Sequence, residues 1–141
     1  NAPVMMQGIF HRGFMDIHAG AAQLLGTPHM AVFRGEGGEI ERRPNKPTQV
    51  WTTHGDGEPV VETWPTLLDD GHQPGDHEMD VDRLIDVWTG KVDDPYATAS
   101  ITGTLAVTLR TMGRAENTEV AQNMADEMWA SRDRDYLPFK A

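Results

Sequence analysis

The first third of the chain combines two short apolar runs with one stretch of helical spacing. Residues 4–10 and 30–33 are apolar runs whose length and flanking residues favour buried strands. Between them, residues 14–25 carry apolar side chains at helical spacing, and Gly26 ends that pattern. The apolar stripe of this helix comprises Phe14, Ile17, Ala21, Leu24 and Leu25. This order predicts a βαβ unit with parallel strands.

The middle of the chain predicts a β-hairpin. Residues 48–53 and 59–64 have the composition of strands, and the Gly-Asp-Gly segment at 55–57 between them is a turn signal. Pro59 and Pro65 flank the second strand, which indicates a position near the edge of a sheet.

The last third of the chain predicts three helices. The first has Asp80 as its cap and ends at Gly90, the second covers 96–112, and the third begins at Asn117 or Thr118. Their apolar positions are Val81, Leu84, Ile85 and Trp88 in the first helix, Ile101, Leu105 and Leu109 in the second, and Val120, Ala121, Met124, Met128 and Trp129 in the third. The second helix is rich in Thr and Ser, so we expect it to depend on burial more than on intrinsic propensity.

These elements predict an α/β architecture made of a βαβ unit, a hairpin and a helical tail. The βαβ unit and an acidic, glycine-rich loop cover 1–47, the hairpin covers 48–66, and the helical tail covers 79–134. Two strands and a hairpin make a thin sheet for three tail helices to cover. We therefore expect the 141 residues to be one segment of a larger α/β domain, which agrees with a chain that begins at Asn1 instead of Met.

Composition and charge exclude several classes of protein. The net charge of −10 does not suit nucleic-acid contact through this segment, since phosphate binding needs a basic footprint. The short basic clusters, Arg42-Arg43 with Lys46 and Arg132 with Arg134, are interpreted as solvated surface charge. The chain has no cysteine and no apolar run near the roughly 20 residues that a membrane helix needs. We expect a cytoplasmic protein without membrane contact.

The most concentrated candidate for chemistry directly follows the second predicted strand. This Gly-Glu-Gly-Gly-Glu-Ile-Glu segment at 35–41 lies at the carboxyl end of a strand, where ligands gather in open α/β sheets. Glu36, Glu39 and Glu41 suit a hard cation such as Mg²⁺, which prefers carboxylate oxygens. The alternative is an acidic turn that leads into the hairpin.

A second group of potential ligands lies between His72 and Asp82. Its spacing matches no compact metal motif, and a solvated loop that runs into a helix start, with acids favoured by the helix dipole, explains it well. The remaining histidines are scattered at positions 11, 18, 29 and 54, and a lone histidine is more often structural than catalytic. With serine only at positions 100 and 131, a serine nucleophile is not expected.

Three stretches of the chain together resemble a known family. They are Asn1-Ala2-Pro3 with the run at 4–10, the segment from Met30 to Glu41, and the tail with Trp88-Thr89-Gly90-Lys91, 101–106 and 117–129. Over nearly its whole length, the chain resembles the C-terminal part of an anthranilate phosphoribosyltransferase-like protein (glycosyl transferase family 3), in its divergent branch with a Gly-Glu-Gly-Gly-Glu loop.

The resemblance implies a fold, an activity and partners. The family has a small helical domain and a larger α/β domain, so the helical domain and the first half of the α/β domain would lie upstream of this chain. Its members are usually homodimers that transfer a phosphoribosyl group from phosphoribosyl pyrophosphate, with Mg²⁺, to an aromatic acceptor. Most of their ligand-binding residues would also lie upstream, so this chain alone is expected to be inactive and to depend on the upstream part of the same protein.

One metal-binding feature of the family falls within this chain. Biosynthetic members hold Mg²⁺ with an adjacent Asp-Glu pair in the loop after the strand, and an ungapped alignment sets that pair on Ile40 and Glu41. The resemblance therefore implies Glu41 as a metal ligand, with Glu39 as a substitute for the missing Asp. This departure leaves two alternatives to the transferase: a non-catalytic protein of the same fold that binds a nucleotide or nucleic acid, and an inactive proteolytic fragment.

Overall fold

The computed structural model describes residues 2–35, 40–72 and 80–137. The elements are β1 (Met5–Ile9), the 3₁₀ helix η1 (Arg12–Phe14), α1 (Met15–Leu24), β2 (Met30–Arg34), β3 (Thr48–Thr53), β4 (Val60–Trp64), α2 (Val81–Thr89), α3 (Pro95–Thr111) and α4 (Thr118–Ala130). This order confirms the predicted strands and helices, with ends that differ by one or two residues. None of the helices among the described residues is long and apolar enough to cross a membrane.

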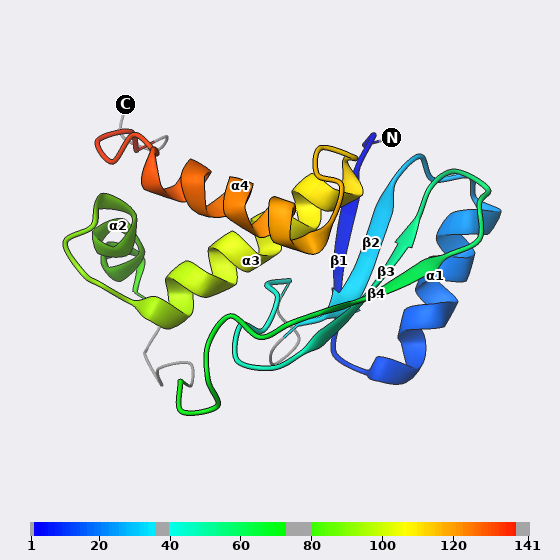
Figure 1. Ribbon diagram of the computed structural model, residues 1–141, viewed down its shortest axis with the longest axis horizontal. Coiled ribbons are helices and arrows are strands. Elements are labelled where there is room, and N and C mark those ends of the chain that lie inside the picture. The colour runs from blue at the N-terminus through cyan, green and yellow to red at the C-terminus, as the bar shows by residue number, and fades with distance from the viewer. Residues whose placement is uncertain (1, 36–39, 73–79, 138–141) are drawn as a thin grey trace.

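A four-stranded mixed sheet forms the centre of the molecule, with the strand order β1-β2-β3-β4 (Figure 1). β1 and β2 are parallel, with Met5 paired to Met30, which confirms the predicted βαβ unit. β2 and β3 are antiparallel, and so are β3 and β4, in which Thr48 pairs with Trp64. The predicted hairpin is therefore confirmed, and its second strand lies at an edge of the sheet, as its flanking prolines indicated.

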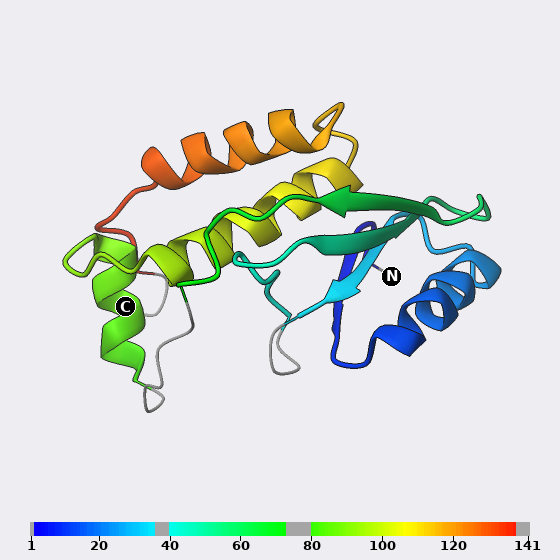
Figure 2. The same cartoon turned by 60° about the horizontal axis from the view of Figure 1, so that its bottom comes forward.

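Helices cover both faces of this sheet. α1 packs on one face, and α3 with α4 lies on the other, with the sheet between them (Figure 2). Because side chains alternate along a strand, β2 supplies both cores: Met30 and Val32 face α1, while Ala31 and Phe33 face α3. This double coverage explains why the predicted run at 30–33 is continuously apolar.

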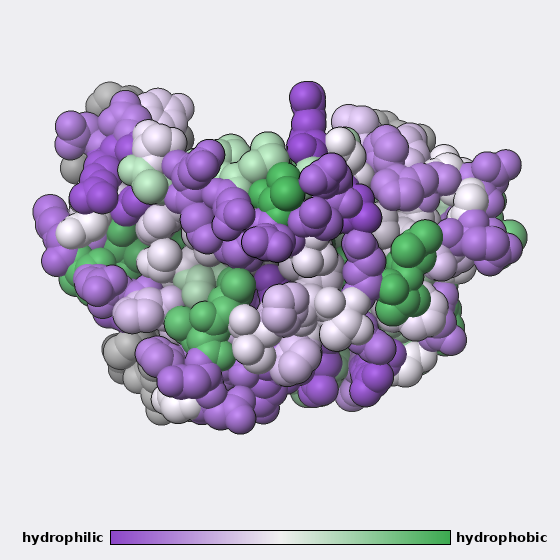
Figure 3. Space-filling model, viewed as in Figure 1, coloured by the Kyte–Doolittle hydropathy of each residue, from purple (hydrophilic) through white to green (hydrophobic). Residues whose placement is uncertain are grey.

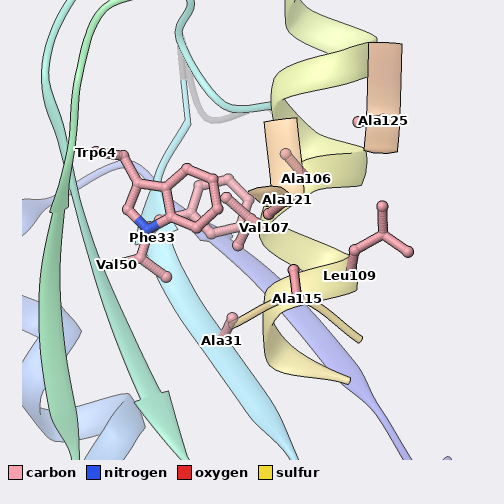
Figure 4. Close-up of a cluster of buried hydrophobic side chains, with 10 residues drawn as sticks. All are labelled: Ala31, Phe33, Val50, Trp64, Ala106, Val107, Leu109, Ala115, Ala121 and Ala125. Carbon is pink, nitrogen blue, oxygen red and sulfur yellow. The ribbon is translucent and has the colours of Figure 1, made fainter. Parts of the chain in front are cut away.

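The larger core lies between the sheet and the pair α3–α4. Figure 4 shows Trp64 of β4 and Phe33 of β2 opposite Ala106 and Val107 of α3. The other buried members of this cluster are Ala31, Val50, Leu109, Ala115, Ala121 and Ala125. The small alanines let the two helices approach the sheet and each other closely, which leaves Trp64 as the largest fully buried side chain.

The predicted apolar stripe of α1 is wrong. Leu24 and Leu25 are 90% and 82% exposed, and Phe14, Ile17 and Ala21 are also exposed. The face toward the sheet carries Met15, Ala19 and Ala22 instead. Both stripes have helical spacing, and the small residues are the buried ones because they allow the helix to lie close to the sheet.

The predicted apolar stripes of the tail helices are also wrong at some positions. In α2 the buried residue is Val87, whereas Val81 and Leu84 are more than half exposed. In α3 the predicted Leu109 is buried, but Ile101 is 39% exposed. The buried face of α3 includes Ser100, Thr102, Gly103, Ala106, Val107 and Thr111.

The ends of the tail helices follow their capping residues. Asp80 accepts a hydrogen bond from the backbone N–H of Asp82, which confirms it as the cap of α2, and Gly90 ends this helix with a positive φ of 79°. Asn117 caps α4 in the same way by accepting from Val120. Thr104, Thr108 and Thr111 of α3 satisfy their hydroxyls within the helix, as when Thr111 donates to the carbonyl of Val107 at 2.8 Å.

Candidate functional site

The acidic loop after β2 is only partly within the described residues. Glu36, Gly37, Gly38 and Glu39 lie outside them. Glu41 is exposed and directly precedes Arg42, which forms an isolated antiparallel bridge with Gly35. Where the chain is described, no three His, Cys, Asp or Glu residues come together to hold a metal ion.

The second acidic group is likewise described only at its ends. Residues 73–79, with Asp76, His77 and Glu78, lie outside the described residues. His72 contacts Asp69 through its Nδ1 at 2.7 Å, and this hydrogen bond lowers the pKa of Asp69. Because Asp80 caps α2, its role is structural.

A pocket that sequence reasoning missed lies on the α1 side of the sheet, beside the carboxyl ends of β1 and β2. Its volume is about 260 Å³. The residues that line it are Arg12, Met15, Arg34, Arg43, Pro47, Thr48, Gln49 and Thr63. Three of them are arginines from separate elements, and none of the described residues in the lining is acidic.

The local structure explains how the three arginines meet. Arg12 begins η1, which follows β1 after Phe10 and His11. Arg34 is the last residue of β2, paired in register with Ile9 of the parallel strand. Arg43 follows the bridge that closes the loop after β2. The carboxyl ends of adjacent parallel strands thus bring together residues that are far apart in the sequence.

The arginines differ in how they are held. Arg12 is exposed and donates a hydrogen bond from Nη2 to Oε1 of Gln49 at 2.9 Å, which fixes its guanidinium over β3. Arg34 is exposed, and within the described part of the chain it makes no hydrogen bond or ion pair. Met15 of α1, 2% exposed, forms the apolar part of the lining.

This lining has the chemistry of an anion site. Guanidinium groups present several N–H donors in a planar fork, which suits the oxygens of phosphate and carboxylate. Thr48, Gln49 and Thr63 add uncharged polar groups. The pocket is therefore a local concentration of positive charge in a chain whose net charge is −10. The signal available in the sequence was the position of Arg12 and Arg34, each at the carboxyl end of a predicted strand.

The interpretation of Arg42 as solvated surface charge is wrong. Arg42 is 1% exposed, and its guanidinium lies over the ring of Trp64 at 5.2 Å from the ring centroid. Its Nη2 donates to the carbonyl of Pro65, and its backbone N–H donates to Oγ1 of Thr104 at 2.8 Å. Burial lowers the pKa of Arg42 to about 10.

Arg132 is also more than surface charge. Its guanidinium lies 3.6 Å from the ring centroid of Trp129 and 5.6 Å from that of Trp88. Its Nε donates to the carbonyl of Trp88 at 2.9 Å. These contacts join the C-terminal ends of α2 and α4, so we assign Arg132 a structural role.

The structure brings two of the scattered histidines together. His29 precedes β2 and His54 follows β3, and their Nδ1 atoms are 2.7 Å apart. Because β2 and β3 are antiparallel, with Met30 paired to Thr53, the residues just beyond this pair are neighbours. Burial, followed by the charges of His29 and Arg110, lowers the pKa of His54.

The other two histidines stay apart. His18 of α1 contacts Oε1 of Gln7 through its Nδ1 at 3.0 Å, and His11 packs edge-on between the rings of Phe10 and Phe14. These contacts account for both side chains structurally.

Comparisons with known proteins give no assignment. Neither the protein-family models nor the curated proteins contain a match to this chain.

Proposed function

We propose that the pocket lined by Arg12, Arg34 and Arg43 binds the phosphate groups of a phosphorylated ligand. The observation that carries this proposal is the meeting of three arginines in one lining beside the carboxyl ends of β1 and β2. Arginine forks suit phosphate oxygens, and this edge of an α/β sheet is where ligands commonly bind.

The resemblance in the sequence supplies the candidate ligand and reaction. The chain would belong to a phosphoribosyltransferase-like protein that transfers a phosphoribosyl group from phosphoribosyl pyrophosphate to an aromatic acceptor. The remaining active-site residues would come from the upstream part of the same protein, which the family implies is a homodimer. The three arginines neutralise negative charge, and a pyrophosphate leaving group needs such neutralisation as its bond to the sugar carbon breaks.

Glu41 is the described candidate ligand for Mg²⁺ in this reaction, with Glu39 as its proposed companion. Glu41 is exposed, so its carboxylate is accessible to a hydrated cation. It also lies two residues before Arg43, which lines the pocket. Glu41 would hold the ion, and the chemistry that magnesium would supply is positive charge for a pyrophosphate leaving group.

Isothermal titration of the full-length protein tests this proposal. We expect phosphoribosyl pyrophosphate with Mg²⁺ to bind more tightly than ribose 5-phosphate, which lacks the pyrophosphate group. Equal affinities for the two ligands, or no heat at millimolar phosphoribosyl pyrophosphate, would exclude the proposed function.

A non-catalytic binding protein of the same fold is the alternative. The observation that favours it is Ile40, 42% exposed, at the position where the resemblance expects an aspartate. Consumption of phosphoribosyl pyrophosphate in the presence of a panel of aromatic acceptors distinguishes the two. Binding without consumption supports the alternative, and consumption supports the transferase.

A further inference from the structure

A buried arginine without a carboxylate partner lies on the opposite side of the sheet from the arginine-lined pocket. Arg42 is 1% exposed, and among the described residues no aspartate or glutamate pairs with it. Its Nε is shielded from water and makes no hydrogen bond. Removing a cation from water is costly unless an anion or several acceptors compensate, and Pro65 supplies one carbonyl.

Arg42 lines a second pocket, between the chain around the end of β4 and the first turns of α4. The volume of this pocket is about 430 Å³. Its lining comprises Arg42, Trp64, Pro65, Leu67, Thr118, Glu119, Gln122 and Asn123. Trp64 is 1% exposed, and its indole Nε1 is a second buried donor without a partner. Nε of Arg42 and Nε1 of Trp64 are thus both buried donors without an acceptor, and the charged one, Arg42, is the group that a bound anion would compensate.

Packing holds Arg42 in this position. The glycine at position 103 lets α3 pass close to it, since a Cβ there would lie 3.4 Å from Nη1 of Arg42 and 2.9 Å from Cδ1 of Leu67. The ring of Trp64 also packs against the guanidinium, with its centroid 5.2 Å from Cζ of Arg42. The cation is therefore fixed before any ligand arrives, which reduces the entropy cost of binding.

The surroundings indicate which anion fits. One buried cation balances one negative charge, and the carboxylate of Glu119 in the same lining disfavours a multiply charged phosphate. Pro65, Leu67 and the ring of Trp64 offer apolar surface to the rest of a ligand. An adjoining pocket of about 340 Å³ shares Leu67 and Gln122 and extends the space along α3. On the face in Figure 3, hydrophobic residues form small separate patches in a mainly hydrophilic surface.

We propose that this pocket binds a small organic monocarboxylic acid, with its carboxylate held by Arg42 and its apolar part against Leu67 and the ring of Trp64. The site is separate from the phosphate site of the proposed function. Arg42 faces α3 and α4, whereas its neighbour Arg43 lines the pocket beside Met15 of α1. Its test therefore does not depend on phosphoribosyl pyrophosphate.

Titration of the protein with hexanoate, followed by the NMR signals of the assigned tryptophan indole N–H groups, tests this proposal. We expect a saturable shift of the Trp64 signal with a dissociation constant of about 1 mM, a value typical of small ligands. Hexanamide, which has the same shape without the charge, should give no saturable shift. No saturable shift with hexanoate up to about 20 mM, or the same shift with hexanamide, would overturn the proposal.

Two exposed positions in the lining test the role of charge without disturbing Arg42. Glu119→Gln removes an acid and should tighten hexanoate binding by roughly twofold, whereas Asn123→Asp adds one and should weaken it by about threefold. Glu127→Gln on the same helix, outside the pocket, is the matched control and should leave the affinity unchanged. If neither lining variant differs from this control, the anion does not bind in this pocket.

Discussion

Arg42 and Arg43 are consecutive residues that serve opposite faces of the sheet. Arg42 is buried against Trp64, and Arg43 lines the pocket beside α1. Local sequence cannot distinguish them, because both belong to one short basic cluster before the hairpin. The burial of Arg42 depends on Gly103 and Trp64, which approach it only in the folded protein. For this reason the prediction of a solvated cluster failed at one position.

Glu41 provides a test of the proposed metal site. We expect Glu41→Ala to weaken the Mg²⁺-dependent binding of phosphoribosyl pyrophosphate to the full-length protein, since it removes an accessible carboxylate ligand. Titrations with and without Mg²⁺ measure this effect. Glu58→Ala, at another exposed glutamate, is the control. Equal weakening of binding in both variants, or no weakening in either, would show that Glu41 is not a Mg²⁺ ligand.

The pair of His29 and His54 makes stability depend on pH. The lowered pKa of His54 means that the folded protein prefers its neutral form, whereas the unfolded chain takes up a proton near pH 6.5. The resulting stabilisation is present above that pH and is lost as the pH falls below it. In addition, two protonated Nδ1 atoms 2.7 Å apart could not share a hydrogen bond.

We therefore expect His54→Gln to reduce the fall in unfolding free energy between about pH 7.5 and about pH 5.5. Urea denaturation at the two pH values gives these free energies. His11→Gln serves as a comparison, because the ring of His11 packs edge-on against Phe10 and Phe14, away from the His29–His54 pair. An identical fall in His54→Gln and the unchanged protein would contradict the role of His54.

At the scale of elements, the hydrophobic pattern predicted where helices and strands lie but not which face each helix buries. The strands could be predicted from the sequence because β2 has apolar side chains on both faces of the sheet and the hairpin carries a turn signal between its strands. In α1 the choice between two stripes depends on how closely the helix approaches the sheet. That distance is set by the small side chains of Ala19 and Ala22, whereas the hydrophobic pattern favours the stripe with the larger apolar residues.

Replacing Gly90 and Gly20 with alanine is expected to change stability in opposite directions. Gly90 ends α2 with a φ of 79°, so Gly90→Ala should cost about 1–2 kcal/mol of unfolding free energy. Gly20 lies inside α1, and a Cβ there would meet no atom within 4 Å. Gly20→Ala should therefore stabilise the protein by up to about 1 kcal/mol.

Thermal or urea unfolding of the two glycine variants measures this difference. Each variant adds the same methyl group. At position 90 the new residue would have to adopt a positive φ and its methyl group would also lie 2.8 Å from Nη1 of Arg134, whereas at Gly20 it meets neither constraint. Destabilisation by Gly20→Ala would contradict the open helical position of Gly20 in α1, and no effect of Gly90→Ala would contradict the positive φ at the end of α2.

At the scale of the whole molecule, the candidate site arises from the topology. Parallel pairing of β1 with β2 brings Arg12 and Arg34 to one edge, and the chain returning from the loop adds Arg43. The sequence predicted the βαβ unit and the importance of this edge. It directed attention to the glutamates, however, because Glu36, Glu39 and Glu41 lie in one short segment, whereas Arg12 and Arg34 are separated in the sequence by α1.

The affinity of full-length protein variants for phosphoribosyl pyrophosphate with Mg²⁺ tests the phosphate-binding pocket most directly. Arg34→Gln removes an exposed charge that has no described partner, so its fold should be preserved. We expect about tenfold weaker binding, since a hydrogen bond to a charged group contributes about 1.5 kcal/mol or more. Arg114→Gln makes the same change at an exposed residue outside the pocket and should bind normally. Equal affinities of the two variants would contradict binding of phosphate at this site.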